Sequence, residues 1–165
     1  MAILSCGMFQ LEAGYKSIKD YSGVLDYEYS FRILINGNPF FSEYIENKLL
    51  VEGGCIIATN DDEDSLLLIF KKIIDAETPV GTELSYYCDV DSPQRIFIDV
   101  SKETFTNCPN LVYYPIKIRL GSDSFIRIMR IGEITLASHW FDTSEIEKFV
   151  REMEREKEEV SIVQL

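Results

Sequence analysis

Apolar and polar residues alternate most clearly in the segment that follows Gly23. Because successive side chains of a strand point to opposite faces, these alternating positions predict one buried face of an extended strand. The residues on that face are Tyr27, Tyr29, Phe31, Ile33 and Ile35. Asn36-Gly37 then supplies two residues that tolerate positive φ, and Pro39 begins a return strand. The pattern therefore predicts a tight β-hairpin.

The residues before Gly23 show no clear periodicity, so we expect only an edge strand at residues 8–12 and a turn at residues 17–21. Alternation returns later in the chain, on both sides of turn-forming residues at 91–94 and 121–124. A polar loop is expected around residues 108–110. The further strands predicted in this way are residues 49–51, 55–58, 84–90, 96–100, 113–120, 125–131 and 133–137.

Two segments show the spacing of apolar residues that is typical of helices. The first, predicted at about residues 62–75, has its apolar positions at Leu66, Ile69, Phe70 and Ile73. Acidic residues precede this run, where they would cap the helix and match the positive end of its dipole. The second, predicted at about residues 143–160, has an apolar stripe of Ile146, Phe149, Val150 and Met153. Asp142 and Glu145 resemble a capping box at its start.

These elements predict an α+β fold, with a mostly antiparallel sheet of about six to eight strands and two helices packed on it. The chain has 165 residues and shows no internal repeat and no linker-like segment. Because this length is close to that of one ordinary domain, residues 1–165 are expected to form a single domain.

The chain is strongly acidic, with a formal net charge of −12. Most of this surplus lies in residues 1–110, whose net charge is −10, whereas residues 111–165 carry −2. Nucleic acids and anionic membranes attract basic proteins, so neither is expected as a partner. A basic protein would be attracted by this charge. The alternative is that the acidity only keeps the protein soluble.

No apolar run approaches the roughly 20 residues that cross a bilayer, and the first residues lack the basic start of an export signal. The cysteines show no CxxC pair and stand far apart, at Cys6, Cys55, Cys88 and Cys108. We therefore expect reduced thiols and a cytoplasmic location.

The only histidine, His139, is the main candidate for catalysis, because a general base needs a titratable imidazole. No motif supplies it with a nucleophile and an orienting carboxylate, so a structural role beside Trp140 is the expectation. The glycines also lack the spacing of phosphate-binding loops. No catalytic residue and no cofactor are therefore expected.

Clustered carboxylates raise the possibility of a metal site or a hydrolase. The run Asp61, Asp62, Glu63 and Asp64 lacks the glycine and the final glutamate that a calcium-binding loop requires at fixed positions. We therefore expect no metal and assign this run to helix capping or to contact with a cationic partner. A second group could offer a carboxylate pair for glycoside hydrolysis but is expected on solvated strand edges and turns: Asp89, Asp91, Asp99 and Glu103.

Basic and tyrosine residues in the predicted strands complete the candidate surfaces. The basic residues of one predicted hairpin are expected to pair with carboxylates of the same chain: Lys117, Arg119, Arg127 and Arg130. Several tyrosines fall in strands, where they either pack in the core or line a binding face, because tyrosine is enriched in protein interfaces.

The prediction for function is a non-catalytic protein that binds a basic protein. In size and charge the chain resembles the immunity proteins that neutralise basic bacterial toxins, and this resemblance implies acidic contacts flanked by tyrosines. The partner-binding residues expected under this hypothesis are Asp61, Asp62, Glu63, Asp64, Tyr87, Asp89 and Asp91. Two alternatives stay open: a structural or regulatory module that dimerises through an open sheet face, and an enzyme that uses His139 with a cysteine or carboxylate.

Overall fold

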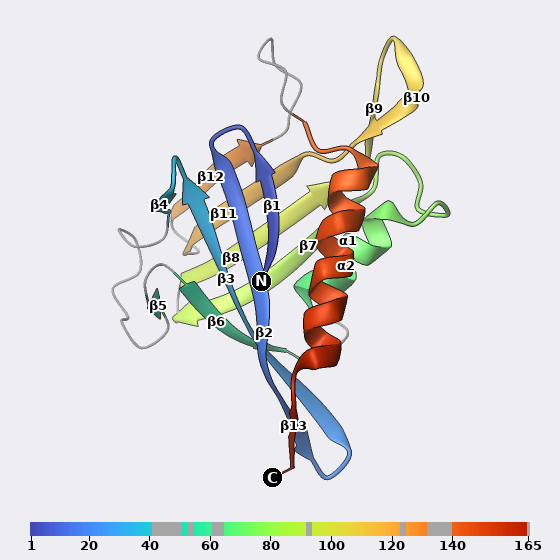
Figure 1. The fold of residues 1–165 in the computed structure, drawn as a ribbon. Helices are drawn as coiled ribbons and strands as arrows, with labels where there is room; N and C mark the ends of the chain where they lie inside the picture. The colour runs from blue at the N-terminus through green and yellow to red at the C-terminus, as the bar shows by residue number, and fades with distance from the viewer. Residues whose placement is uncertain are drawn as a thin grey trace. The chain divides into compact units, whose positions relative to one another are not determined.

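The computed structural model describes residues 1–40, 51–52, 55–60, 65–91, 94–122, 125–131 and 140–164 (Figure 1). The chain divides into two compact units, one made of Met1–Leu68 with Phe149–Leu165 and the other of Ile69–Lys148. Each unit holds one of the larger sheets, and each is described by itself. The expectation of a single domain over residues 1–165 stays a prediction.

The α+β class is confirmed. Within the ranges given above, the chain forms two helices and thirteen strands, which are arranged in sheets of seven, four and two strands. All strand pairs are antiparallel except that of β13 with β2. Neither helix in this part of the chain is long and apolar enough to cross a membrane.

The seven-stranded sheet of the first unit is built on two long antiparallel strands, β2 and β3, with β1 beside β2 and β6 beside β3. β5 continues the sheet from β6, β4 pairs with β3, and β13 pairs with the last part of β2. The bounds are β1 Ala2–Cys6, β2 Phe9–Tyr21, β3 Val24–Ile35, β4 Asn38–Pro39, β5 Val51–Glu52, β6 Cys55–Asn60 and β13 Ile162–Gln164.

Two tight turns join the strands of this sheet. Asn36 and Gly37 have φ of 52° and 75° and connect β3 to β4, so the predicted hairpin is confirmed. Ser22 and Gly23 form a second turn of this kind, with φ of 57° and 95°, between β2 and β3. The strand predicted at 8–12 is confirmed, but its edge position is wrong, because β1 and β3 pair with it on opposite sides. The turn predicted at 17–21 is also wrong, because the chain is extended from Phe9 to Tyr21.

The missing periodicity of β2 has a physical cause. Residues 11–15 are all buried, so both faces of this strand are covered there and no polar alternation arises. The buried carboxylate of Glu12 accepts hydrogen bonds from Arg32 Nε on β3 and, over 2.6 Å, from Gln10 Nε2. The charge of the buried Glu12 is thereby compensated by Arg32 and Gln10.

Helix α2 (Thr143–Glu159) agrees with the predicted helix at 143–160. Its capping box is confirmed: Asp142 Oδ1 accepts a hydrogen bond from Glu145 N, and Glu145 Oε2 accepts one from Asp142 N, both over 2.9 Å. The predicted apolar stripe is buried, at Ile146, Phe149, Val150 and Met153. In the first unit the last turns of α2 lie against the sheet, where Lys157 Nζ stands 4.3 Å from the centroid of the Tyr27 ring.

Helix α1 (Leu66–Ile74) lies within the predicted segment 62–75. Its first turn is capped by Ser65, whose Oγ accepts a hydrogen bond from Leu68 N over 3.2 Å. The acidic residues predicted to cap this helix, at 61–64, lie outside the described part. After the last turn, the buried Lys102 donates from Nζ to the carbonyl oxygens of Asp75 and Thr78, both over 2.8 Å.

The second unit contains a four-stranded antiparallel sheet, in the order β12-β11-β8-β7, and the separate hairpin of β9 with β10 (Figure 1). The predicted strand at 113–120 is interrupted at Pro115, and the expected polar loop at 108–110 is part of a strand. The predicted strand at 133–137 lies outside the described part. The bounds are β7 Glu83–Asp91, β8 Gln94–Ser101, β9 Glu103–Phe105, β10 Cys108–Tyr113, β11 Ile116–Ser122 and β12 Phe125–Ile131.

Candidate functional site

The strands β7, β8 and β11 present two chemically different faces. One face is apolar and buried, and it includes Tyr86, Cys88, Ile96, Ile98, Val100, Ile116 and Ile118. The alternate positions form the opposite face, which is called the polar face below. It consists of Glu83, Ser85, Tyr87, Phe97, Asp99, Ser101, Lys117 and Arg119.

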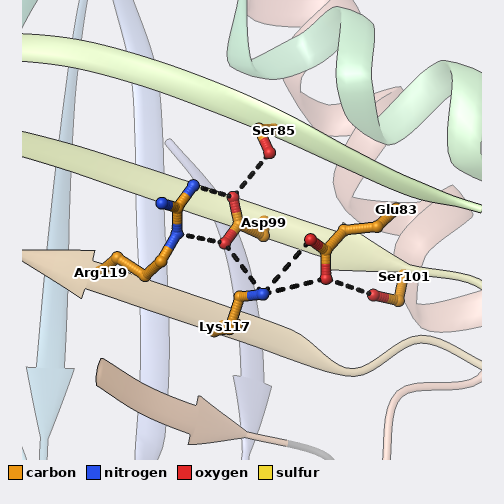
Figure 2. Close-up of polar contacts among 6 residues, drawn as sticks. All are labelled: Glu83, Ser85, Asp99, Ser101, Lys117 and Arg119. Atoms are coloured by element: carbon orange, nitrogen blue, oxygen red, sulfur yellow. Dashed lines mark hydrogen bonds and ion pairs between the residues drawn. The ribbon is translucent and has the colours of Figure 1, made fainter.

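Asp99 is the centre of the polar face, although it is one of the most buried charged residues described. Its Oδ2 accepts from Arg119 Nε over 2.7 Å, and its Oδ1 accepts from Arg119 Nη2 over 3.0 Å (Figure 2). Ser85 Oγ donates to Oδ1 over 2.7 Å, and Lys117 Nζ lies 3.5 Å from Oδ2. Both oxygens of the carboxylate therefore have partners, which is the condition for burying a charge without a large penalty.

The strand register explains this convergence. Ser85 on β7 and Lys117 on β11 are both paired with Asp99 on β8, so the three residues form one row across the sheet. Arg119 is paired with Phe97 and is therefore a diagonal neighbour of Asp99, and its side chain reaches back to the Asp99 carboxylate. The network is thus built from directly opposite and diagonal neighbours, the pairs that interact across a sheet.

The network favours the charged form of each partner. Burial by itself would raise the pKa of Asp99, but the hydrogen bonds from Arg119 and Ser85, together with the charges of Arg119 and Lys117, outweigh it and hold this pKa below its ordinary value. The hydrogen bond to Asp99 raises the pKa of Arg119. Such a low pKa is opposite to the raised value that a carboxyl group needs as a general acid.

A second carboxylate extends the network toward the start of β7. Lys117 Nζ donates to Glu83 Oε1 over 3.2 Å and to Oε2 over 3.1 Å, and Ser101 Oγ donates to Oε2 over 3.2 Å. Lys117 therefore bridges Glu83 and Asp99 (Figure 2). The four charged side chains that the structure describes on the polar face, two acidic and two basic, cancel one another.

Two aromatic rings and one guanidinium group stand at the other end of the polar face. The rings of Tyr87 and Phe97 lie 5.1 Å apart between centroids, and Arg119 Cζ lies 4.1 Å from the centroid of Phe97. The side chain of Tyr87 is 38% exposed. These three residues are called the aromatic platform below. Because Asp99 holds Arg119 from one side and Phe97 holds it by a cation–π contact, the platform is preorganised.

The predicted partner-binding residues can be placed only in part. Tyr87 lies on the aromatic platform. Asp89 and Asp91 continue the same strand, paired with Arg95 and Gln94, but the positions of their side chains lie outside the description. Asp61, Asp62, Glu63 and Asp64 lie outside the described residues, and so does His139.

One expectation about this region is wrong. Asp99 was expected on a solvated edge, but it is buried in the middle of the sheet. The expected pairing of the basic residues with carboxylates of the same chain is confirmed for Lys117 and Arg119. Phe97 and Arg119 were not predicted as site residues. The signal that could have found them is the alternation of Phe97, Asp99 and Ser101 with apolar residues in β8.

Other chemistry is sparse in the described part of the chain. No group of three or more histidine, cysteine, aspartate or glutamate residues there has a geometry that could hold a metal ion. Of the cysteines described, Cys88 is buried, Cys6 is half-buried and Cys108 is exposed. The fold and the polar face thus define an α+β protein with an ion-paired sheet face that carries exposed aromatic area. Comparison of the chain with protein-family models, with curated proteins and with solved structures found no match.

Proposed function

We propose that this protein is a non-catalytic binding protein that holds a basic protein partner, in the manner of an immunity or inhibitor protein that neutralises a toxin in the cytoplasm. The observation that carries the proposal is the aromatic platform of Tyr87, Phe97 and Arg119.

The composition and rigidity of the aromatic platform suit a protein interface. Tyrosine and arginine are enriched among the residues that contribute most to binding, because they combine contact area with hydrogen-bonding groups. Association loses free energy when side chains must be ordered. The bidentate contact of Arg119 with Asp99 orders this side chain before any partner arrives.

The charge of the whole chain supports a basic partner. A net charge of −12 produces a field that attracts cations over a Debye length of about 8–10 Å at physiological salt. The polar face itself adds no net charge from its four described ionic groups, so it does not oppose this attraction. Long-range attraction and short-range contact would then come from different residues.

The state of Asp99 supports binding rather than catalysis. A catalytic carboxyl group needs a pKa near the working pH and a free lone pair directed at the substrate. Asp99 has a lowered pKa, and its two oxygens are engaged by Arg119, Ser85 and Lys117. These contacts have a structural role, because they hold the side chains of the polar face in one arrangement.

The experiment compares Tyr87→Ala with Tyr21→Ala as a matched control, because Tyr21 is also exposed, at 48% against 38%, but lies at the end of β2. Each purified variant and the wild type are used to capture proteins from a lysate of the native cells. Captured proteins are then purified, and their affinities are measured at low and high salt.

We expect a captured protein with a pI above about 9. Its affinity should fall with salt, mainly through slower association. Tyr87→Ala should weaken binding by about 2 kcal/mol, or roughly thirtyfold, whereas Tyr21→Ala should bind like the wild type. Equal binding by both variants, or a captured partner that is acidic, contradicts the proposal. A chain that instead dimerises through Tyr87, with a concentration-dependent mass, supports the rival regulatory module.

A further inference from the structure

A second cluster of apolar side chains, some exposed and some half-buried, lies in the same unit, where the β9–β10 hairpin meets the start of α2. The ring centroids of Phe105 and Tyr113 are 5.0 Å apart, and those of Phe105 and Trp140 are 5.4 Å apart in an edge-to-face arrangement. Leu111, which is 57% exposed, lies two residues before Tyr113 in β10, next to the register shift between Cys108 and Val112. These four residues are called the Trp140 patch below.

The Trp140 patch is both exposed and held in place. Trp140 is 42% exposed, which is unusual for the largest apolar side chain unless it serves an interface. The backbone that follows Trp140 is anchored, because Tyr114 N donates to Phe141 O over 3.0 Å, and the Tyr114 hydroxyl lies 3.1 Å from Thr143 Oγ1. The indole therefore stands directly before an anchored helix start.

The charged groups next to the Trp140 patch are mainly acidic. Glu103 is paired with Tyr113 across the hairpin, and Asp142 and Glu145 follow Trp140 at the start of α2. Lys102 is turned toward the carbonyl oxygens of Asp75 and Thr78. Lys148 lies one turn further along α2, and Lys117, four residues after Tyr113, is paired with Glu83 and Asp99. The bonds from Ser144 Oγ and Glu145 N also lower the pKa of Asp142, so it stays charged.

We propose that the Trp140 patch is a docking surface for a cationic segment of a partner protein, with an arginine or lysine side chain stacked on Trp140 and apolar contact at Leu111. A cation is attracted to the face of an indole ring, and surrounding carboxylates strengthen this attraction. An acidic segment would be repelled by the carboxylates of Glu103, Asp142 and Glu145. The inference rests on the proposed function only in the basic character of the partner.

The sequence supplies a direct reporter, because Trp140 is the only tryptophan. The first measurement compares the quenching of its fluorescence by caesium and by iodide with that of N-acetyltryptophanamide, at low salt. A negative surface concentrates caesium and excludes iodide. We expect the ratio of the caesium quenching constant to the iodide quenching constant to be about threefold higher for the protein than for N-acetyltryptophanamide. The ratio for Glu103→Gln should be lower than that for the wild type. A ratio equal to that of the free indole overturns the proposal.

The second measurement titrates the protein with two synthetic peptides of equal length and no aromatic residues, one alternating arginine with leucine and one alternating glutamate with leucine. The emission of Trp140 should shift with the arginine peptide and not with the glutamate peptide. Leu111→Ser should weaken the arginine peptide about fivefold, as expected for loss of about 1 kcal/mol of apolar contact. Val80→Ser is the matched control, because Val80 and Leu111 are 51% and 57% exposed.

The outcomes separate this inference from the proposed function. Equal shifts with both peptides, no shift with either, or equal effects of Leu111→Ser and Val80→Ser overturn docking at Trp140. Tyr87→Ala should leave the titration with the arginine peptide unchanged, because Tyr87 belongs to the aromatic platform. Loss of partner capture in Tyr87→Ala with a failed peptide titration would therefore support the proposed function and exclude the Trp140 patch.

Discussion

Removing the charge of Asp99 is the most informative perturbation of the second unit. Asp99→Asn keeps the size of the side chain but leaves Arg119 and Lys117 without their shared carboxylate. Breaking a buried ion pair by removing one partner costs about 3–5 kcal/mol. We expect about 3 kcal/mol, the low end of that range, because Arg119 and Lys117 are partly exposed and water can solvate their charges.

The loss should depend on pH in a defined direction. The pKa of Asp99 is lower in the folded protein than its ordinary value of 3.8, so the unfolded chain takes up the proton first as the pH falls. The contribution of Asp99 is therefore fully present above that value and is lost as the pH falls through the folded-state pKa. Near neutral pH the variant should melt about 6–12 °C below the wild type, and the difference should shrink in acid.

Urea unfolding followed by circular dichroism measures the loss, at neutral pH and in acid. Glu77→Gln is the control, because it removes a carboxylate from an exposed turn. A loss below about 1 kcal/mol, the size of an exposed ion pair, would refute the role of burial in this reasoning. So would a loss that is the same in acid as at neutral pH, because the pKa of Asp99 would then not differ between the two states.

Three further substitutions test local features of the fold by urea unfolding. Asp142→Ala should destabilise the protein by about 1 kcal/mol through loss of the α2 cap, and no loss would contradict the capping box. Lys102→Met should cost about 2–3 kcal/mol because the carbonyl oxygens of Asp75 and Thr78 lose a charged donor, whereas the exposed Lys16→Met should cost little. Gly37→Ala should lower the free energy of unfolding by about 1 kcal/mol through its positive φ alone, because no atom lies within 4 Å of the added Cβ. Gly37→Asn should lower it less, because asparagine tolerates positive φ better than alanine does. Equal losses in the two variants would exclude the conformational explanation.

Local signals account for the parts of the fold that the sequence predicted. The hairpin at Asn36-Gly37 needs only two residues that accept positive φ between alternating segments. The start of α2 depends on Asp142 and Glu145, three residues apart, and the buried side of the helix follows from its period. Each of these features depends on residues that lie close together in the sequence, so the local pattern is enough to predict it.

The features that escaped prediction depend on distant partners. β2 is covered on both faces, so its pattern carries no period, and only its neighbours β1, β3 and β13 show that it is one strand. β13 pairs in parallel with β2 across most of the length of the chain, at Ile162 with Ile18. No local pattern near Ile162 distinguishes this short strand from a tail, because the pairing supplies its order.

The candidate site shows the same division between local and distant information. Tyr87 could be predicted because it sits at a polar position of an alternating strand, whereas the burial of Asp99 depends on which residue of β11 stands opposite. In the observed register that residue is Lys117, with Arg119 on the diagonal.

A slip of β11 by one residue against β8 would place Ile116 or Ile118 opposite Asp99 and turn the cations to the other face. The carboxylate would then be buried without a cationic partner, at a cost of several kcal/mol. The ion pair therefore disfavours the shifted pairing of β8 with β11, and Asp99 helps to place Phe97 and Arg119 side by side in the aromatic platform.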